Sequence, residues 1–250
     1  MIDLSGRTAM VTGGSRGVGA ATAALLARAG ADVAITCRSR IQDAERVAAG
    51  IRALGRRAHV AVGDLTDEAT VRRVVASIGE VFGRLDIVVA NAGTWPFEEV
   101  TLDAMESARW RETLAANLDG VFFTLRAAIP LMRGSGAIVL VASTAGQRGE
   151  ALHADYAASK GAIISLTKSL AVECAPGIAV NCVAPGWIDT EMAAPALKGG
   201  ERERIASNIP IGRIASAEDV AGPIVFLASP LARHITGEIL NVNGGSVLCG

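Results

Sequence analysis

Short apolar runs alternate with longer amphipathic stretches along the chain. Continuous apolar runs bounded by Gly, Asn or Asp are typical of strands that are buried on both faces. Such runs predict seven strands, at Thr8–Thr12, Asp32–Cys37, Ala58–Val62, Ile87–Ala90, Ala137–Ala142, Ala179–Val183 and Ile239–Val242. Ala-rich stretches between them predict helices at Gly17–Ala29, Gln42–Leu54, Asp67–Phe82, Leu102–Met132, Asp155–Glu173 and Ala217–Leu227. We expect the long fourth helix to break into two.

The alternation of strands and helices is typical of βαβ units, in which the sheet is largely parallel. A chain of 250 residues without a repeat or a flexible linker favours one domain over residues 1–250. We therefore predict an α/β fold, a single doubly wound Rossmann-type domain with a mostly parallel seven-stranded sheet and helices on both faces. Residues 188–213 lack clear periodicity and are expected to form a mobile substrate lid, with a surface insertion as the alternative.

The composition excludes several classes of function. Hydrophobic residues make up 50% of the chain, the net charge is −1, and no run of like charges suggests a nucleic-acid partner. The spacing of Cys37, Cys174, Cys182 and Cys249 fits neither a metal site nor a disulfide framework, so we expect reduced thiols. No signal peptide is evident, and every apolar run looks too short or too interrupted to cross a membrane. These features predict a cytoplasmic protein.

A glycine-rich turn follows the first predicted strand, in the sequence Thr12-Gly13-Gly14-Ser15-Arg16-Gly17-Val18-Gly19. Glycines let the backbone approach a pyrophosphate, and the following helix start offers unpaired N–H groups and the positive end of its dipole. The turn predicts a dinucleotide site with contacts from Gly13, Ser15, Arg16, Gly17, Val18 and Gly19. A tight turn without a ligand is the alternative, because the spacing differs from the commoner Gly-x-Gly-x-x-Gly.

The end of the second strand bears on the choice of dinucleotide. An acidic residue there would accept hydrogen bonds from a ribose 2′-hydroxyl, whereas an arginine would meet a 2′-phosphate. Arg38 and Ser39 follow this strand, and Arg16 can bring a second guanidinium to the same phosphate. The pattern predicts NADP(H) as the cofactor, with two solvated arginines as the alternative.

The third and fourth strands end in residues that we expect on the same rim of the sheet. Asp64 and Leu65 follow the third strand, and Asn91, Ala92 and Gly93 follow the fourth. The adenine half of the dinucleotide is expected beside them. Asp64 and Asn91 can equally cap a helix or shape a turn.

Ser143, Tyr156 and Lys160 form the candidate catalytic group. Ser143 follows the fifth apolar run, and Tyr156 and Lys160 share a helix face at i and i+4. A neighbouring ammonium favours the phenolate, and we expect it to move the pKa of Tyr156, the only tyrosine, from about 10 toward neutrality. Tyr156 can then exchange a proton with a carbonyl or alcohol oxygen that Ser143 hydrogen-bonds. A half-buried Tyr with a solvated Lys is the alternative.

Together these motifs resemble the short-chain dehydrogenase/reductase family over nearly the whole chain. The match includes the turn at Thr12 to Gly19, Asn91-Ala92-Gly93, Ser143 and the Tyr-x-x-x-Lys of Tyr156 and Lys160. One small departure is Ala90, where the family often has Asn. The resemblance implies cofactor contacts from Tyr156, Lys160, Pro185, Gly186, Ile188 and Thr190, the last two at the nicotinamide half.

The resemblance also implies a fourth catalytic residue, Asn117, as a proton relay. From the residues alone Asn117 is a mid-helix Asn, for which a helix kink is the alternative. A homotetramer is implied as well, with the helix of Tyr156 and residues 237–250 at its interfaces.

The leading hypothesis is an NADP(H)-dependent reductase of a 3-oxoacyl-type ketone with Tyr156 as general acid, and a carrier-bound acyl chain is one form in which such a ketone is presented. The alternatives are a dehydrogenase of a sugar, steroid or other secondary alcohol, and a nucleotide-sensing protein without catalysis. Trp95, Phe97, Trp187 and Met192 are candidates for an apolar substrate pocket or for ordinary packing. His153, three residues before Tyr156, is expected to be exposed rather than to act as a base.

Overall fold

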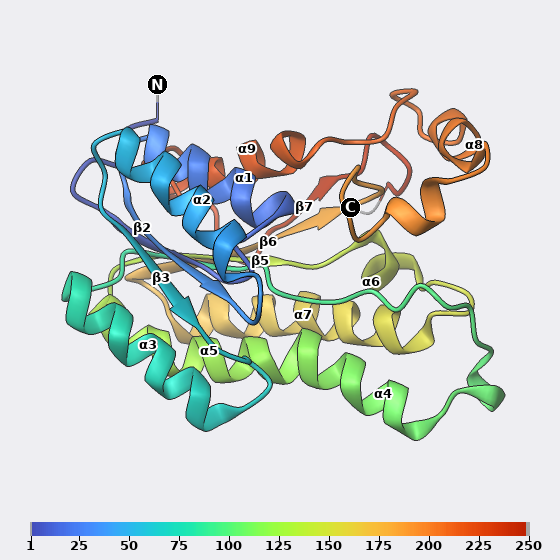
Figure 1. The fold of residues 1–250 in the computed structure, drawn as a ribbon, viewed down its shortest axis with the longest axis horizontal. Coiled ribbons are helices and arrows are strands. Elements are labelled where there is room, and N and C mark those ends of the chain that lie inside the picture. Colours follow the sequence, from blue (N-terminus) through green and yellow to red (C-terminus); the bar gives the residue numbers. More distant parts are fainter. Residues whose placement is uncertain (1, 249–250) are drawn as a thin grey trace.

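The computed structural model describes residues 2–248, and within them seven strands form one sheet (Figure 1). These strands are β1 (Thr8–Val11), β2 (Asp32–Cys37), β3 (Ala58–Val62), β4 (Ile87–Ala90), β5 (Gly136–Val141), β6 (Ile178–Pro185) and β7 (Ile239–Val242). All neighbouring strands are parallel, in the order β3-β2-β1-β4-β5-β6-β7. The chain winds from β1 outward to β3, returns to β4 beside β1, and winds outward again to β7. The predicted doubly wound α/β fold is confirmed.

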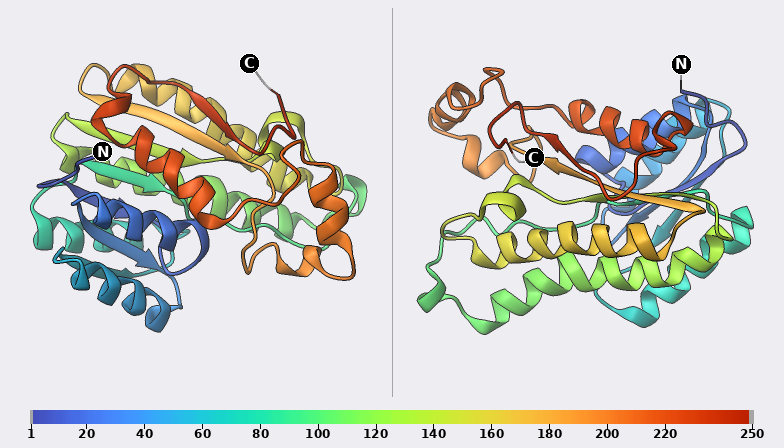
Figure 2. Two further views of the ribbon diagram at one scale, coloured as in Figure 1. Left: turned by 90° about the horizontal axis from the view of Figure 1, so that it is seen from above. Right: turned by 180° about the vertical axis from the view of Figure 1, so that it is seen from behind.

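Helices cover both faces of the sheet, as Figures 1 and 2 show. One face carries α1 (Gly17–Arg28), α2 (Ile41–Ala53) and α9 (Ala217–Leu227), and the other carries α3 (Glu68–Phe82), α5 (Gly120–Ala128) and α7 (Ala154–Glu173). Each face has its own apolar core, and the adjacent β1 residues Met10 and Val11 point into different ones. The strands are therefore continuous apolar runs because both of their faces are buried.

Apart from the long fourth helix, the predicted element boundaries lie within two residues of those in the structure. The largest difference is at β6, which continues to Pro185 because its last residues pair with β7. The apolar run alone does not reveal that pairing. Asp67 is the N-cap of α3 rather than its first residue, and its side chain accepts a hydrogen bond of 2.8 Å from the N–H of Thr70.

The long predicted helix does break, but near its start, where the extended backbone of Met105 and Glu106 separates a 3₁₀ turn (Leu102–Ala104) from the rest of the run. α4 (Ser107–Leu114), a π-helical stretch (Ala115–Asp119) and α5 follow one another directly, and a 3₁₀ turn (Ile129–Met132) ends the run. Over residues 107–132 this run is long and apolar enough to cross a membrane, by length and composition only. The prediction that every apolar run is too short or too interrupted to do so is therefore wrong for this run. In the fold, α5 packs against α3 and β4, and α4 packs against α7. The run is therefore part of the helical layer that also contains α3 and α7.

Residues 188–213 form an ordered cap that follows the carboxyl end of β6 (Figure 1). They contain a 3₁₀ turn (Ala194–Leu197) and α8 (Glu201–Ser207), neither of which the sequence pattern predicts. A parallel bridge between Ile188 and Ala215 closes the base of this segment. Its small apolar core consists of Ala193, Leu197, Ile205 and Ile209, packed against Trp187 and Ile214. The role of this segment as a substrate lid stays a prediction.

Two predictions extend beyond the described residues. Cys37, Cys174 and Cys182 are free thiols, while Cys249 lies outside residues 2–248. The implied interface segment, residues 237–250, is described only as far as residue 248. Its part in an oligomer stays a prediction.

Candidate active site

The glycine-rich turn joins the carboxyl end of β1 to the first turn of α1. Gly13 and Gly17 have φ angles of +65° and +53°, a region that favours glycine. Gly19 is needed for a different reason, because a Cβ there would lie 2.3 Å from the carbonyl oxygen of Gly13. Arg16, the N-cap of α1, makes no side-chain hydrogen bond to the helix. The turn is therefore a close-fitting backbone cradle before an uncapped helix start, which fits a pyrophosphate.

The segment after β4 supports this turn from the neighbouring strand. The Oγ1 atom of Thr12 accepts hydrogen bonds from the N–H groups of Asn91 and Ala92, at 3.0 and 2.9 Å. The Nδ2 atom of Asn91 donates to the carbonyl oxygen of Thr12 at 2.9 Å. Ser15 is half-buried in the turn, and Val18 packs against the core of the α1 face. The structure thus brings the predicted groups of the first and fourth strand ends together.

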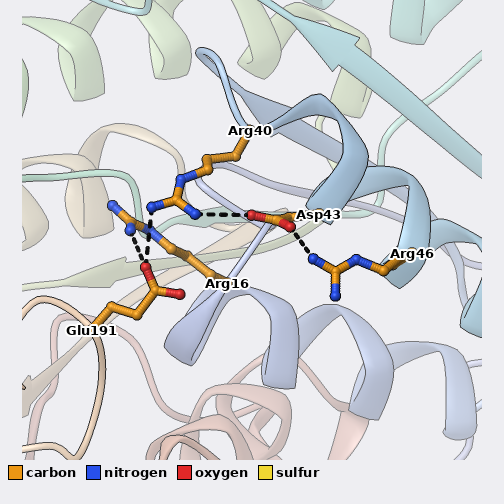
Figure 3. Close-up of polar contacts among 5 residues, drawn as sticks. All are labelled: Arg16, Arg40, Asp43, Arg46 and Glu191. Atoms are coloured by element: carbon orange, nitrogen blue, oxygen red, sulfur yellow. Dashed lines mark hydrogen bonds and ion pairs between the residues drawn. The ribbon is translucent and has the colours of Figure 1, made fainter.

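Two arginines converge on one carboxylate beside the turn (Figure 3). The Oε2 atom of Glu191 lies 2.5 Å from Nη1 of Arg16 and 3.2 Å from Nη2 of Arg40. Arg40 also contacts Asp43 at 3.3 Å, and Asp43 in turn pairs with Arg46. Arg16 is thus paired through Glu191 with Arg40, whereas the sequence analysis paired it with Arg38. The Arg-Ser-Arg sequence at positions 38–40 is the signal that could have revealed Arg40.

Arg38 lies near the carboxyl end of β3 instead. Its Nη1 atom is 3.8 Å from Oδ2 of Asp64, and the two side chains are 73% and 44% exposed. The other carboxylate oxygen of Asp64 accepts hydrogen bonds from the N–H and the hydroxyl of Thr66, at 2.9 and 2.8 Å. Asp64 therefore has the turn-shaping role that the sequence left open. Ser39 is exposed, and Leu65 packs against the core of the α3 face.

The chain that leaves β6 passes next to the glycine-rich turn. The N–H of Gly186, directly after Pro185, donates to the carbonyl oxygen of Val242 at 3.2 Å and extends the pairing with β7. Ile188 forms the bridge at the base of the 188–213 segment. A Cβ on Gly17 would lie 3.4 Å from the Cγ2 atom of Thr190, so these two residues are in contact distance of each other. The structure thus places Thr190 against the first turn of α1.

Ser143 and Tyr156 meet beyond the carboxyl end of β5. Ser143 is the N-cap of α6 (Thr144–Arg148), and its Oγ atom accepts a hydrogen bond of 3.1 Å from the N–H of Ala145. Burial raises the pKa of the Tyr156 phenol, a hydrogen bond with Ser143 lowers it, and the negative charge of Glu150 raises it. The net direction is upward. The expected shift toward neutrality is therefore wrong for the chain by itself, because burial outweighs the favourable contacts.

Lys160 is buried one helical turn after Tyr156, with 5% of the residue exposed. Its Nζ atom donates a hydrogen bond of 2.9 Å to the carbonyl oxygen of Val141 and lies 5.9 Å from the centre of the Tyr156 ring. Burial lowers the pKa of Lys160 to about 8, and the nearby Cys182 acts in the opposite direction. The alternative of a solvated lysine is wrong. Gly146 makes this packing possible, since a Cβ there would lie 2.5 Å from the carbonyl carbon of Lys160.

Asn117 lies in the π-helical stretch and is fully buried. Its Oδ1 atom accepts a 2.7 Å hydrogen bond from the N–H of Thr94, and its Nδ2 atom donates to the Thr94 carbonyl at 2.9 Å and to Ser159 at 3.0 Å. A Cβ on Gly93 would lie 2.9 Å from Oδ1 of Asn117 and 3.4 Å from Nζ of Lys160. Asn117 therefore joins the loop after β4 to α7 beside Lys160. Wider helical turns of this kind often occur at functional sites.

A buried ion pair next to Tyr156 was missed by the sequence analysis. The Asp155 carboxylate is fully buried and accepts hydrogen bonds from Nε of Arg109, at 3.1 Å, and from the hydroxyl of Thr113, at 2.8 Å. Burial acts to raise the pKa of Asp155, but these two hydrogen bonds and one from the Tyr156 N–H outweigh it, so the pKa is lowered. The pair fastens α4 to the first turn of α7, which carries Tyr156.

Aromatic side chains gather one turn before Tyr156. Trp95 stacks on His153 with ring centres 5.1 Å apart, and it makes edge contacts with Trp187 at 5.8 Å and Phe97 at 6.0 Å. His153 is only 5% exposed, so the expectation of an exposed histidine is wrong. The stacking on Trp95 is the physical reason for its burial. Met192, the fourth predicted pocket residue, is 43% exposed.

Comparison with known proteins defines the class to which this fold and site belong. A family model described as enoyl-(acyl carrier protein) reductase matches residues 13–246. A short-chain dehydrogenase/reductase of Brucella melitensis, described as a glucose/ribitol dehydrogenase, superposes with a TM-score of 0.92 at 34% identity, covering 99% of each chain. The chain belongs to the short-chain dehydrogenase/reductase family, whose members are oxidoreductases of alcohol and ketone groups that use a nicotinamide cofactor.

Relatives within this family act on different substrates. The cis-4-hydroxycyclohexanecarboxylate dehydrogenase of Sinomonas cyclohexanicum is 42% identical, with 96% of each chain covered. The 3-oxoacyl-[acyl-carrier-protein] reductase of Escherichia coli K12 is 38% identical, with 98% of each chain covered. A solved structure from Beutenbergia cavernae, described as an NAD(P)-dependent gluconate 5-dehydrogenase with NADP at low occupancy, has a TM-score of 0.90 at 39% identity and covers 98% of each chain. Similarity alone therefore does not select a substrate.

Proposed function

We propose that the chain is an NADP(H)-dependent carbonyl reductase in which Tyr156 donates the proton. The observation that carries this proposal is the phenol of Tyr156, whose ring centre lies 5.9 Å from a buried lysine amine and whose pKa is lowered by the nearby Ser143 hydroxyl and raised more strongly by burial. A phenol with a raised pKa keeps its proton at neutral pH, which supports proton donation rather than proton abstraction in the free chain. Ketone reduction, which consumes this proton, is the direction that we propose.

Each residue of the group has a distinct part in the proposed reaction. The dinucleotide would be held by the cradle at Gly13–Gly19 and, when bound, supplies the hydride. Ser143 donates a hydrogen bond to the substrate carbonyl oxygen, and the Tyr156 hydroxyl transfers its proton to that oxygen as negative charge develops there. Lys160 stabilises the resulting phenolate by charge. Asn117, bonded to Thr94 and Ser159 beside Lys160, is proposed to connect the amine to the proton supply.

The choice of NADP(H) rests on three guanidinium groups at the carboxyl ends of β1 and β2. Arg16 and Arg40 converge beside the turn, and Arg38, two positions before Arg40, is exposed and lies near Asp64. A 2′-phosphate is negatively charged and accepts charge-assisted hydrogen bonds from such groups, whereas a 2′-hydroxyl carries no charge. The NADP bound in the relative from Beutenbergia cavernae supports the same choice. The remaining predicted contacts, at Ser39, Asp64 and Leu65, are proposed to surround the adenosine.

Replacing Arg38 by Asp is expected to weaken NADPH binding by about 10- to 100-fold, because a charged hydrogen bond is worth roughly 1.5–3 kcal/mol and the new carboxylate repels phosphate. NADH binding should change far less. Fluorescence titration of both dinucleotides measures this, with Arg233→Asp as a matched control, since Arg233 is exposed and contacts only the Pro230 carbonyl of its own turn among the described residues. Equal losses for NADPH and NADH would show that Arg38 does not read the 2′-phosphate.

For the substrate, we propose a 3-oxoacyl-type ketone whose acyl chain is carried by a carrier protein. This proposal draws on the 3-oxoacyl reductase relative and on the aromatic group around Trp95. A sugar or other secondary-alcohol dehydrogenase is the second candidate, because the relatives from Sinomonas cyclohexanicum and Brucella melitensis are described as dehydrogenases of such compounds.

The two candidates separate in one assay of purified protein. We expect NADPH oxidation with a β-ketoacyl thioester to exceed, by at least about tenfold in kcat/KM, NADP⁺ reduction with a panel of sugars and cyclic or steroid alcohols. Turnover of the alcohols alone would remove the 3-oxoacyl assignment. Absence of turnover throughout, with intact dinucleotide binding, would favour a nucleotide-sensing protein. A cytoplasmic homotetramer stays a prediction that none of these assays addresses.

A further inference from the structure

Glu191 is the one acidic residue drawn in contact with Arg16 in Figure 3, and it comes from a distant part of the chain. It follows Thr190 at the start of the 188–213 segment, whereas Arg16 belongs to the glycine-rich turn and Arg40 directly precedes α2. One oxygen, Oε2, contacts both guanidinium groups, at 2.5 and 3.2 Å. A single carboxylate oxygen between two guanidinium groups is the arrangement that a phosphate oxygen also adopts.

We propose that Glu191 is a specificity-determining residue that competes with the 2′-phosphate of the cofactor for Arg16 and Arg40. This inference rests on the proposed NADP(H) site and deepens it. The carboxylate and the phosphate are both anions that need the same N–H donors, and like charges at this distance repel. Binding of a 2′-phosphate therefore requires the Glu191 side chain to leave, which breaks its ion pairs with Arg16 and Arg40.

The exposure of the three side chains makes this exchange feasible. Arg16, Arg40 and Glu191 are 47%, 51% and 58% exposed, so the ion pairs are weak and water can replace them. A dianionic phosphate offers more charge and more acceptor oxygens than one carboxylate. Glu191 thus lowers the apparent affinity for a 2′-phosphate only by the fraction of time during which it occupies the arginines.

Asp43 does not have this role, although it also contacts Arg40. Its carboxylate lies between Arg40 and Arg46 at the start of α2 and forms no ion pair with Arg16, so it orients Arg40 from the far side (Figure 3). Hydrogen bonds from Arg46 and Arg40 lower the pKa of Asp43, which keeps it ionised at neutral pH. The competition is therefore specific to the carboxylate that comes from the 188–213 segment.

The test compares two adenosine probes that differ only in the phosphate at the 2′ position, adenosine 2′,5′-bisphosphate and adenosine 5′-monophosphate. Calorimetric titration of the whole protein measures their affinities without any catalytic turnover. We expect Glu191→Gln to tighten the 2′,5′-bisphosphate by about 2- to 10-fold and to leave the monophosphate within twofold. The gain should shrink as salt is raised, because the competing charges are exposed. Glu203→Gln, in α8 of the same segment, is the matched control, since Glu203 is exposed and its electrostatic neighbour is Arg202.

The outcomes separate this inference from the proposed cofactor. If wild type prefers the 2′,5′-bisphosphate and Glu191→Gln leaves that preference unchanged or weakens it, the competition is overturned while the NADP(H) site stands. If only Glu191→Gln shows the preference, the competition is supported and the proposed NADP(H) preference of the wild type is wrong. If neither protein distinguishes the probes, both are overturned. If Glu203→Gln tightened the 2′,5′-bisphosphate equally, the gain in affinity would come from the change in net charge. That result would also overturn the specific role of Glu191.

Discussion

Replacing Tyr156 by Phe is expected to lower kcat for ketone reduction by about 10³-fold, within the ~10²- to 10⁴-fold that a positioned general acid contributes. Phe keeps the ring and its packing but has no proton to donate, and the chain contains no other tyrosine. Single-turnover oxidation of bound NADPH measures the loss. A variant that keeps full activity would refute the assignment of Tyr156 as the acid.

The binding measurements for this variant distinguish a chemical defect from a structural one. Loss of one polar group from a partly buried ring typically costs about 1 kcal/mol of folding stability, so Tyr156→Phe should remain folded. NADPH affinity should stay near that of wild type, because the cradle at Gly13–Gly19 is formed by other elements. A parallel loss of NADPH binding and activity would instead assign Tyr156 to cofactor binding.

The position of Lys160 explains why the phenol needs help that the chain alone does not supply. The amine is buried and hydrogen-bonded to the Val141 carbonyl, and burial has already brought its pKa down to about 8. Burial penalises the charged forms of both groups, and the pKa of Tyr156 is therefore raised. A positive charge added to the site, such as that of an oxidised nicotinamide, is the remaining means of lowering it. Phenolate formation is thus expected to be coupled to the oxidised cofactor.

The alternation of apolar strands and Ala-rich helices was sufficient to predict the fold, because the five inner strands are mostly buried on two faces and the helices on one. α8 escaped prediction because its sequence, Glu201 to Ser207, is mostly charged and buries only Ile205. The continuous run through α4 and α5 escaped it because a π-helical stretch keeps the helix intact across Asn117. Local periodicity carries no signal for such a widened turn.

The candidate site was predictable where its residues lie in local motifs, and less so where partners come from distant segments. Tyr156 and Lys160 are one helical turn apart, and the glycine-rich turn is continuous in sequence. By contrast, the contact of Glu191 with Arg16 spans 175 positions, and that of Asp155 with Arg109 spans 46. Charged residues at such separations can be paired only once the strand order and the helix packing are known.

The Asp155–Arg109 pair supports the largest stability prediction. Asp155→Asn removes the charge that balances a mostly buried guanidinium, since the Arg109 side chain is only 16% exposed and that of Asp155 is fully buried. Removing one partner of such a pair typically costs about 3–5 kcal/mol, and we expect about 2–4 kcal/mol here because Arg109 retains some contact with water and with the Glu98 carbonyl. Urea unfolding at fixed protein concentration, followed by tryptophan fluorescence, measures the loss.

The dependence of that loss on pH identifies the carboxylate as its source. The pKa of Asp155 is lowered in the folded chain, so its stabilisation is present above the unfolded pKa of about 3.9 and disappears as the pH falls through the lower folded value. Wild type and Asp155→Asn should therefore differ fully at pH 7 and converge below about pH 4. In a double-mutant cycle with Arg109→Gln, the second substitution should cost much less once Asp155 is already replaced. Independent, additive losses of stability would mean that the two side chains contribute through packing alone. The position of α7, and with it that of Tyr156, would then depend on the apolar contacts of the helix.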